Sequence, residues 1–168
     1  MEILQTITNA VMGHLWIIGL IAAIFFIVWI LGIRFIPNNK VGIVEKILSK
    51  EPNKGTIIAL NGEAGFQAEL LRGGIHIRPR FFYKIHQVNL ITIAQGEIGY
   101  VFARDGKALE ASQTLGKTVE CDNFENVQSF LENGGQKGPQ RSILREGTYA
   151  LNLAQFIVIT KDDTYYMP

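Results

Sequence analysis

Side chains that could carry out acid–base, nucleophilic or metal chemistry are few in this sequence and stand far apart. None of His14, His76 and His86 lies in a His-Glu-x-x-His run or beside cysteines at the spacing of a zinc site. Asp105 and Asp162-Asp163 have the surroundings of turn residues, without a second carboxylate at a meaningful spacing. No Gly-x-Ser-x-Gly run, phosphate-binding loop or dinucleotide-binding glycine pattern occurs. We expect no catalytic centre, metal or cofactor, and keep a membrane-bound hydrolase as the enzymatic alternative.

Composition also limits the partners. The 168 residues include 16 Lys and Arg and 15 Asp and Glu, a formal charge of +1, so no overall field favours nucleic acid or an acidic substrate. The single cysteine, Cys121, excludes an intrachain disulfide and fits a reducing compartment. No sequence partner suggests a nucleophile, so we interpret Cys121 as a small, half-buried residue.

One cluster of cations and aromatic rings could bind a surface rather than a small molecule. The run Arg-Pro-Arg-Phe-Phe-Tyr-Lys over residues 78–84 resembles an interfacial patch, with rings among lipid headgroups and cations toward phosphate. The alternative is an ordinary strand, whose alternation would put at least one of Phe81 and Phe82 in the core. The predicted membrane-surface contacts are Arg78, Arg80, Phe81, Phe82, Tyr83 and Lys84.

A long apolar segment would bring such a patch to a membrane. Residues 11–33 carry no formal charge and would form a helix of roughly 35 Å, against a hydrocarbon core of about 30 Å. A cleaved signal peptide fits poorly, because residues 1–10 contain no Lys or Arg and Ile33-Arg34-Phe35 is a poor cleavage site. A segment apolar on every side also fits neither a core helix nor an interfacial helix. We predict a short tail over 1–10 and a single-pass transmembrane helix over 11–33, with Trp16, Trp29 and Arg34 as interfacial anchors.

The distribution of cations around this segment predicts its orientation. No Lys or Arg precedes the segment, and the positive-inside bias therefore places the rest of the chain in the cytoplasm. The cations that follow it are Arg34, Lys40, Lys46, Lys50 and Lys54.

The part of the chain after the helix contains the same pattern twice. Residues 65–74 and 138–147 share Gly-x-Gln-x-x-(Leu/Ile)-Leu-Arg-x-Gly, and a similar strand precedes each copy, at 41–44 and 98–101. We predict a repeated strand–turn–strand unit in which both aliphatic residues enter the core, the Arg leads into a tight turn and the last Gly occupies a strained position. The residues expected to have structural roles are Gly65, Gln67, Arg72, Gly74, Gly138, Gln140, Arg145 and Gly147.

Local signals add one turn and one helix. Asn61-Gly62 predicts a turn between the apolar runs 56–60 and 66–71. Asp122, with Glu125 three residues later, predicts a capped helix that ends at Asn133-Gly134-Gly135. Its apolar stripe is Phe124, Val127, Phe130 and Leu131. The predicted fold class is α+β, with one transmembrane helix, a β-rich domain containing the internal repeat, and one short amphipathic helix.

These motifs resemble the SPFH superfamily, also called band 7 or the stomatin/prohibitin/flotillin group. The resemblance rests on PNNKVGIVEK at 37–46, Gly-Ile-His-Ile-Arg-Pro at 74–79, GYVFARDG at 99–106 and LREGTYALN at 144–152. The bacterial flotillin-like branch is the most similar, notably through GEAGFQAELLRGGIHIRP at 62–79. The resemblance covers roughly residues 36–160.

The resemblance implies a membrane-proximal domain over 34–160 and a scaffold that organises membrane lipids and proteins, as in a membrane microdomain, through homo-oligomerisation. The alternative is a membrane-tethered adaptor that recruits or regulates a client such as a membrane protease. Family members continue into a second subdomain and a coiled coil, so residues 161–168 are expected to be a tail at a truncation point. The implied partners are the lipid bilayer, other copies of the full-length form and a membrane-protein client.

Overall fold

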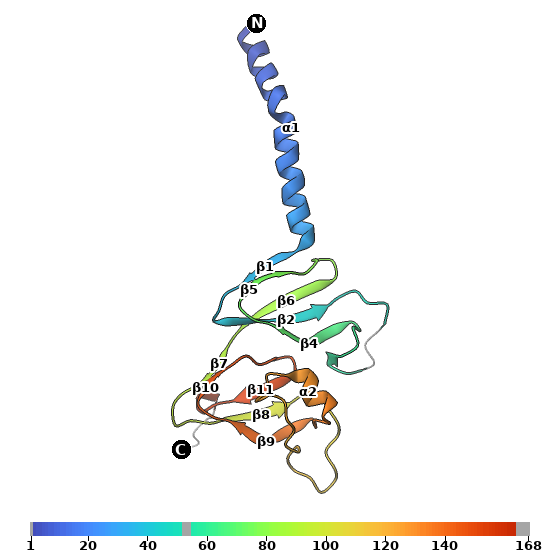
Figure 1. Cartoon of the computed structure of the whole chain (residues 1–168), viewed down its shortest axis with the longest axis vertical. Coiled ribbons are helices and arrows are strands. Elements are labelled where there is room, and N and C mark those ends of the chain that lie inside the picture. The colour runs from blue at the N-terminus through green and yellow to red at the C-terminus, as the bar shows by residue number, and fades with distance from the viewer. Residues whose placement is uncertain (1, 52–54, 164–168) are drawn as a thin grey trace.

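The computed structural model describes residues 2–51 and 55–163, with side chains from Met12 onward. Figure 1 shows helix α1 (Glu2–Leu31) standing on a β-rich body, with the N-terminus at its far end. The helix begins at Glu2, so the part of the predicted tail that is described is helical. Gly32 adopts a φ of +64°, a conformation that ends helices, and the first strand starts at Ile33. The predicted span therefore ends at Leu31, and its last residue belongs to a strand.

The body consists of strands and one short helix, which confirms the α+β class. The first half contains β1 (Ile33–Ile36), β2 (Lys40–Lys46), β3 (Ile58–Ala59), β4 (Gly65–Leu71), β5 (Gly74–Ile77) and β6 (Tyr83–Asn89). The second half contains β7 (Ile91–Ile93), β8 (Gly99–Ala103), α2 (Val127–Glu132), β9 (Gly138–Leu144), β10 (Gly147–Tyr149), β11 (Phe156–Ile159) and a 3-10 turn at Lys161–Asp163.

The two halves repeat one strand pairing. In the first half β2 lies between β4 and β6, and β1 pairs with β5; in the second half β8 lies between β9 and β11, and β7 pairs with β10. The registers also correspond, because Gly42 pairs with Leu71 as Gly99 pairs with Leu144, and an irregularity follows at the same point of each ladder. The predicted repeat is confirmed, and it includes more strands than those that carry the shared sequence motif.

Each half also has an inner core between its two-stranded sheet and its larger sheet, and the two cores are equivalent. In the first half, buried Ile36, Val44 and Leu71 pack with Tyr83 and Ile85. The residues at the same strand positions of the second half are Ile93, Val101, Leu144, Phe156 and Val158. The second aliphatic residue of the motif therefore enters this core.

The first aliphatic residue of the motif faces away from this inner core; the prediction that it is buried holds for Leu70 and is wrong for Ile143. Neighbouring residues of a strand face opposite sides of the sheet. Leu70 accordingly packs into the core between the halves, whereas Ile143 is 40% exposed.

The halves share a larger core, as expected for units too small to cover their own apolar faces. Ile43 of β2 lies in one cluster with Phe124, Val127 and Phe156 of the second half, and Leu70 packs against that cluster. The three aromatic rings Phe124, Phe130 and Phe156 contact one another edge-on or tilted, with centroids 5.1–6.1 Å apart. The two copies therefore pack together through this core while forming separate sheets.

The predicted helix start is wrong. Asn126 caps α2, with its Oδ1 accepting from the Ser129 N–H at 3.0 Å. Asp122, Asn123 and Phe124 have φ values of 52°, 50° and 67°, so the chain makes a left-handed turn there that buries Phe124. Burial of this aromatic ring overrides the local capping signal.

The predicted stop of the helix is confirmed, and so is its buried stripe, except that Phe124 lies before the helix. Val127 and Phe130 are buried, and Leu131 packs against the core. The helix ends at Glu132, and Gly134 has a positive φ.

The turn at Asn61-Gly62 forms, with a φ of +79° at Gly62. It does not join a hairpin, because β3 pairs with β4 in parallel, Ile58 facing Phe66. Asp105 explains this arrangement in part, since its Oδ2 accepts from the Ile57 and Ile58 N–H groups at 2.8 and 3.3 Å. This contact also ties the first half to the second.

Candidate functional site

The junction between α1 and the body is built by the turn that joins β5 to β6. Arg78 donates its N–H to the Gly32 carbonyl at 3.3 Å, and a Cβ at Gly32 would lie 2.0 Å from the Arg78 carbonyl oxygen. Trp29, in the last turns of α1, contacts the Phe81 ring edge-on at 5.9 Å, and the Arg80 guanidinium lies 5.8 Å above the Trp29 ring. The helix therefore enters the body through a packed joint rather than through a linker.

Beside this joint the β1–β5 ribbon presents an apolar face. Ile33 pairs with Ile77 and Phe35 with Ile75, and strand alternation directs all four side chains to the same side. Phe35 is 67% and Ile75 72% exposed, whereas Ile36 on the opposite side is buried. We call Ile33, Phe35, Ile75 and Ile77 the ribbon face. Exposed apolar side chains this dense mark an interaction surface.

The predicted patch at 78–84 adjoins the ribbon face, with one correction. Phe81 and Phe82 are both exposed, because residues 80–82 form a turn and not a strand. Tyr83 packs instead against the inner core of the first half. Lys84 lies in β6, where it pairs with Glu45 across the ladder.

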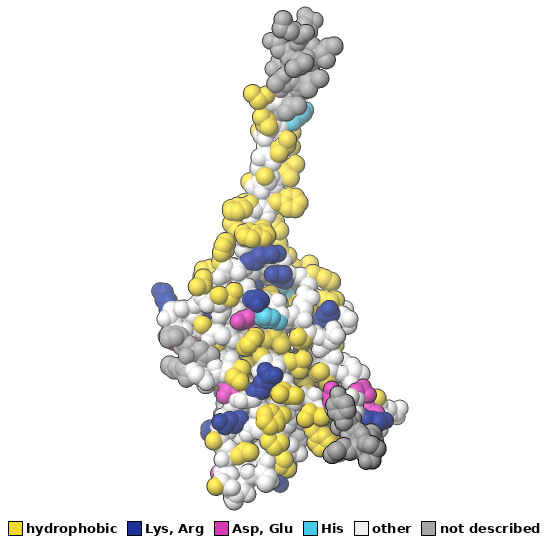
Figure 2. Space-filling view, turned by 180° about the vertical axis from the view of Figure 1, so that it is seen from behind, with side chains coloured by type: hydrophobic (Ala, Val, Ile, Leu, Met, Phe, Trp, Pro, Cys, Tyr) yellow, Lys and Arg dark blue, Asp and Glu magenta, His cyan; other side chains and the backbone are white. Residues whose placement is uncertain are grey.

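The cations of the patch have different environments. Both carboxylate oxygens of Glu69 accept from Arg78 at 2.6 Å, and the Arg78 guanidinium also lies over the Tyr83 ring. Arg80 has no carboxylate partner within the described residues, and its Nε is buried without an acceptor there. Lys and Arg side chains are seen directly beneath the helix in Figure 2. Arg80 therefore lies at the foot of α1 with its guanidinium against the Trp29 ring rather than against a carboxylate.

Of the predicted interfacial anchors, Trp16 lies exposed on α1, several turns away from the joint. Trp29 forms part of the joint through its contact with Phe81. Arg34 lies in β1, paired with His76 across the ribbon. The structure thus brings Trp29, Arg80 and Phe81 together, and it does not add Trp16 to them.

The repeat-motif residues hold the two ladders in shape. The Gln67 side-chain amide donates to the Glu63 and Gly65 carbonyls at 3.0 Å each, and the Gln140 amide donates to the Gln136 and Gly138 carbonyls at 2.7 and 2.8 Å. Sequence comparison of the two copies marks these glutamines, but their hydrogen bonds become evident only in the fold.

The last glycine of each motif copy has the strained conformation that was predicted, and the first glycine of each copy also has a positive φ. The φ values are +140° at Gly74 and +146° at Gly147, and they are +122° at Gly65 and +110° at Gly138. Side chains rarely adopt these values, so glycine is required at the start of each motif strand and after each motif turn.

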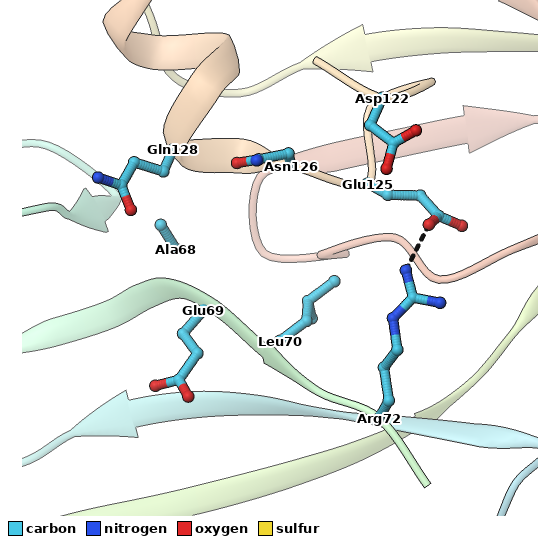
Figure 3. A pocket seen from close by; sticks show the side chains of 8 residues that line it. All are labelled: Ala68, Glu69, Leu70, Arg72, Asp122, Glu125, Asn126 and Gln128. Carbon is cyan, nitrogen blue, oxygen red and sulfur yellow. Dashed lines mark hydrogen bonds and ion pairs between the residues drawn. The ribbon is translucent and has the colours of Figure 1, made fainter.

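The two motif arginines differ in their surroundings. Arg72 reaches from the end of β4 to Glu125, with 2.5 Å between Nη2 and Oε2, beside a hollow of about 330 Å³ between β4 and the start of α2 (Figure 3). The other Glu125 oxygen accepts from the Ala150 N–H at 2.8 Å. Arg145, the equivalent residue, is exposed and has no carboxylate partner in the described part of the chain. Sequence reasoning missed Glu125 because it assigned this residue to a capping box.

The groups considered for chemistry have structural partners. His76 Nε2 lies 2.7 Å from the Arg72 carbonyl oxygen, and His86 Nε2 lies 2.6 Å from Glu45 Oε2. Burial raises the pKa of the Cys121 thiol above its ordinary value. Among residues 2–51 and 55–163, no three His, Cys, Asp or Glu side chains are grouped to hold a metal ion.

One helix of the described chain, Met12–Leu31, is long and apolar enough to cross a membrane, and none of its apolar window is buried against the body. Comparisons with known proteins add little. No family model matches the chain, and no solved structure matches it. The carbamoyl phosphate synthase large chain of Thermoanaerobacter pseudethanolicus (strain ATCC 33223 / 39E) is 27% identical over 103 residues, which are 61% of this chain and 9% of that protein. These comparisons show no family for the chain.

Proposed function

We propose that this protein is a membrane-anchored scaffold subunit whose duplicated β module is seated on the bilayer surface. The observation that carries the proposal is the joint at Trp29, Gly32 and Arg78, which continues α1 into β1 with the ribbon face exposed beside it. A helix that crosses the bilayer and ends in a packed joint holds the adjoining surface at the headgroups. Apolar side chains there gain about 25 cal/mol for each Å² removed from water.

The resemblance of the sequence motifs to the SPFH superfamily supports the scaffold reading. In that family, membrane-proximal domains of this kind organise lipids and proteins as oligomers. The joint and the ribbon face agree with such a role, because a module fixed at the surface can order its neighbours in the plane of the membrane.

The seating is tested with an environment-sensitive fluorophore attached to single cysteines in the full chain. With Cys121→Ser as the background, labels at Ile75→Cys and Phe82→Cys should emit at shorter wavelength in liposomes and be quenched by lipids that carry a quencher near the headgroup. A label at Lys137→Cys, exposed in the second half, is the matched control and should remain in water. Equal, water-like emission from all three positions would refute the seating.

Orientation is part of the same proposal. The five cations that follow the apolar segment, with none before it, favour a cytoplasmic body. Four of them lie in the described chain, and Lys54 lies outside the described residues. Protease added to intact cells should leave the body uncut; cleavage without permeabilisation would reverse the orientation.

An adaptor for a membrane-protein client is the second candidate, favoured by a sheet of the second half that has one uncovered face. The mass of the complex extracted from native membranes in mild detergent separates the two. A scaffold predicts particles of many copies, and an adaptor predicts one or two copies with a client.

A further inference from the structure

The duplicated fold allows a comparison between equivalent faces of its two central strands. β2 is buried on both sides, since Gly42 and Val44 face the inner core while Ile43 faces the second half. β8 is buried on one side only, and its residues alternate between buried and exposed. The outer face of the second sheet is therefore the uncovered equivalent of a face that is covered in the first sheet.

The molecule itself shows what covers this face in the first half. Phe124 and Val127 lie in one buried cluster with Ile43, and Leu70 packs against that cluster. Glu125, between Phe124 and Val127 in the chain, forms the ion pair with Arg72 at the edge of the sheet. The covering segment thus combines apolar side chains with one carboxylate. Figure 3 shows this carboxylate meeting Arg72.

The uncovered face of the second sheet has residues equivalent to those that the covering segment contacts in the first half. Tyr100 and Ile143 stand where Ile43 and Leu70 stand in the first half, and Arg145 stands where Arg72 does. Tyr100 is 56% exposed. Hydrophobic side chains are seen in the lower half of Figure 2, at the height of β8, β9 and β11 in Figure 1. The exposed apolar residues of this outer face are Ile98, Tyr100, Phe102, Ile143, Ile157 and Ile159.

The face is also hollowed where a covering side chain would enter. A hollow of about 310 Å³ lies between Ile98, Tyr100 and Thr160, and another of about 430 Å³ lies between Ile98, Ile143 and Arg145. The second hollow lies between the apolar face and the Arg145 guanidinium, and Glu97 and Glu146 also line it. Glu97 pairs with Lys161 and Glu146 accepts from the Gly96 N–H, so neither carboxylate is paired with Arg145.

We propose that this outer face binds a segment of a partner protein that carries apolar side chains around a carboxylate, the carboxylate pairing with Arg145. A carboxylate is expected because the equivalent Arg72 pairs with one, whereas Arg145 has none within the described residues. The hollows on the face have room for bulky apolar side chains. This inference stands on the duplication alone and does not depend on how the module sits on the bilayer.

The test uses the full chain in its native membranes, with the photo-crosslinking amino acid p-benzoylphenylalanine introduced at Tyr100. Irradiation should yield a protein adduct whose cross-linked peptide, identified by mass spectrometry, contains Asp or Glu next to large apolar residues. The change Arg145→Glu should reduce that adduct at least about tenfold, the factor that corresponds to about 1.4 kcal/mol. Replacing the partner's carboxylate by Lys should restore it.

Controls separate the face from the rest of the surface. Lys50→Glu, which reverses an exposed cation of the first half, should leave the adduct unchanged, and a crosslinker at exposed Leu115 should not form it. The thermal melting of each variant is measured in detergent, and Ile157→Asn supplies a second, uncharged disruption of the face. Adducts only with lipid, only with another copy of this chain, or with none overturn the proposal, as does an adduct that is insensitive to Arg145→Glu.

Discussion

At the residue scale, two equivalent glutamines have the same hydrogen bonds in different surroundings. Gln140 is 6% exposed, whereas Gln67 is only partly buried. Gln140→Leu should leave two buried carbonyl groups without a donor and lower the free energy of unfolding by about 1–3 kcal/mol. Gln67→Leu should cost less, because water can reach its carbonyls. Urea denaturation of both variants in detergent measures the difference, and equal losses would contradict the role of burial.

The lone cysteine gives a second prediction at this scale. Because burial raises the pKa of Cys121, its thiol stays protonated in the folded protein at pH 8. Alkylation by iodoacetamide should therefore be slow in the native protein and fast in urea. The contribution of the neutral thiol to the free energy of unfolding is fully present below the ordinary pKa of 9.0. This contribution is lost as the pH rises through the raised pKa of the folded protein. Rapid native alkylation at pH 8 would show that Cys121 is accessible.

At the element scale, the start of α2 can be tested by comparing the predicted cap residue, Asp122, with the cap residue of the structure, Asn126. Asn126→Ala should lower the stability by about 1 kcal/mol, because it removes the acceptor of the Ser129 N–H. Asp122→Gly is the matched control, because glycine accepts the φ of 52° at this position. It should change the stability little, since Asp122 is exposed and caps no helix. Thermal melting of the two variants in detergent measures both effects; a larger loss at Asp122 would restore the capping-box interpretation.

The joint is the other element that a single change should break. A Cβ at Gly32 would collide with the Arg78 carbonyl, and its φ of +64° already disfavours a side chain. Gly32→Val should therefore separate α1 from the turn at 78–82. Fluorescence of Trp29 should report the loss of its contacts with Arg80 and Phe81, with Gly19→Val, where the added Cβ meets no atom, as the control. Unchanged emission in both variants would mean that the joint tolerates the side chain.

At the scale of the whole molecule, the halves should fold as one unit because they share a core. A chain that ends at Glu120 lacks Phe124, Val127 and Phe156, which lie in one buried cluster with Ile43. We expect the first half of this truncated chain to be unfolded as well. Hydrogen exchange should show the amides of β2 and β4 losing protection together. Persistent protection there would mean that the first half is stable alone.

Assembly is a separate property at this scale. No sustained heptad follows α1, so residues 33–168 made without this helix should be monomers or small oligomers by light scattering. The chain has to begin at Ile33, because a start at residue 37 would remove β1 and the buried Ile36. A particle of ring size would show that the β module itself carries the assembly contacts.

Patterns that repeat locally could be read from the sequence. The apolar run of α1, the glycines that need positive φ at the two motif turns, and the duplicated pattern itself each depend on neighbours along the chain. Backbone sterics and alternation act at short range, so the residues alone fix them. The same reasoning found the turn cations and aromatic rings at 78–84.

Contacts between distant segments required the tertiary structure. Phe124 is drawn into the shared core, which winds residues 122–124 into a left-handed turn and moves the helix cap to Asn126. Glu125 thereby becomes the partner of Arg72. The two motif arginines look alike in sequence and differ only in what lies opposite them. Which copy of a repeated face is covered depends on packing between the copies, and packing is a property of the assembled fold rather than of either copy.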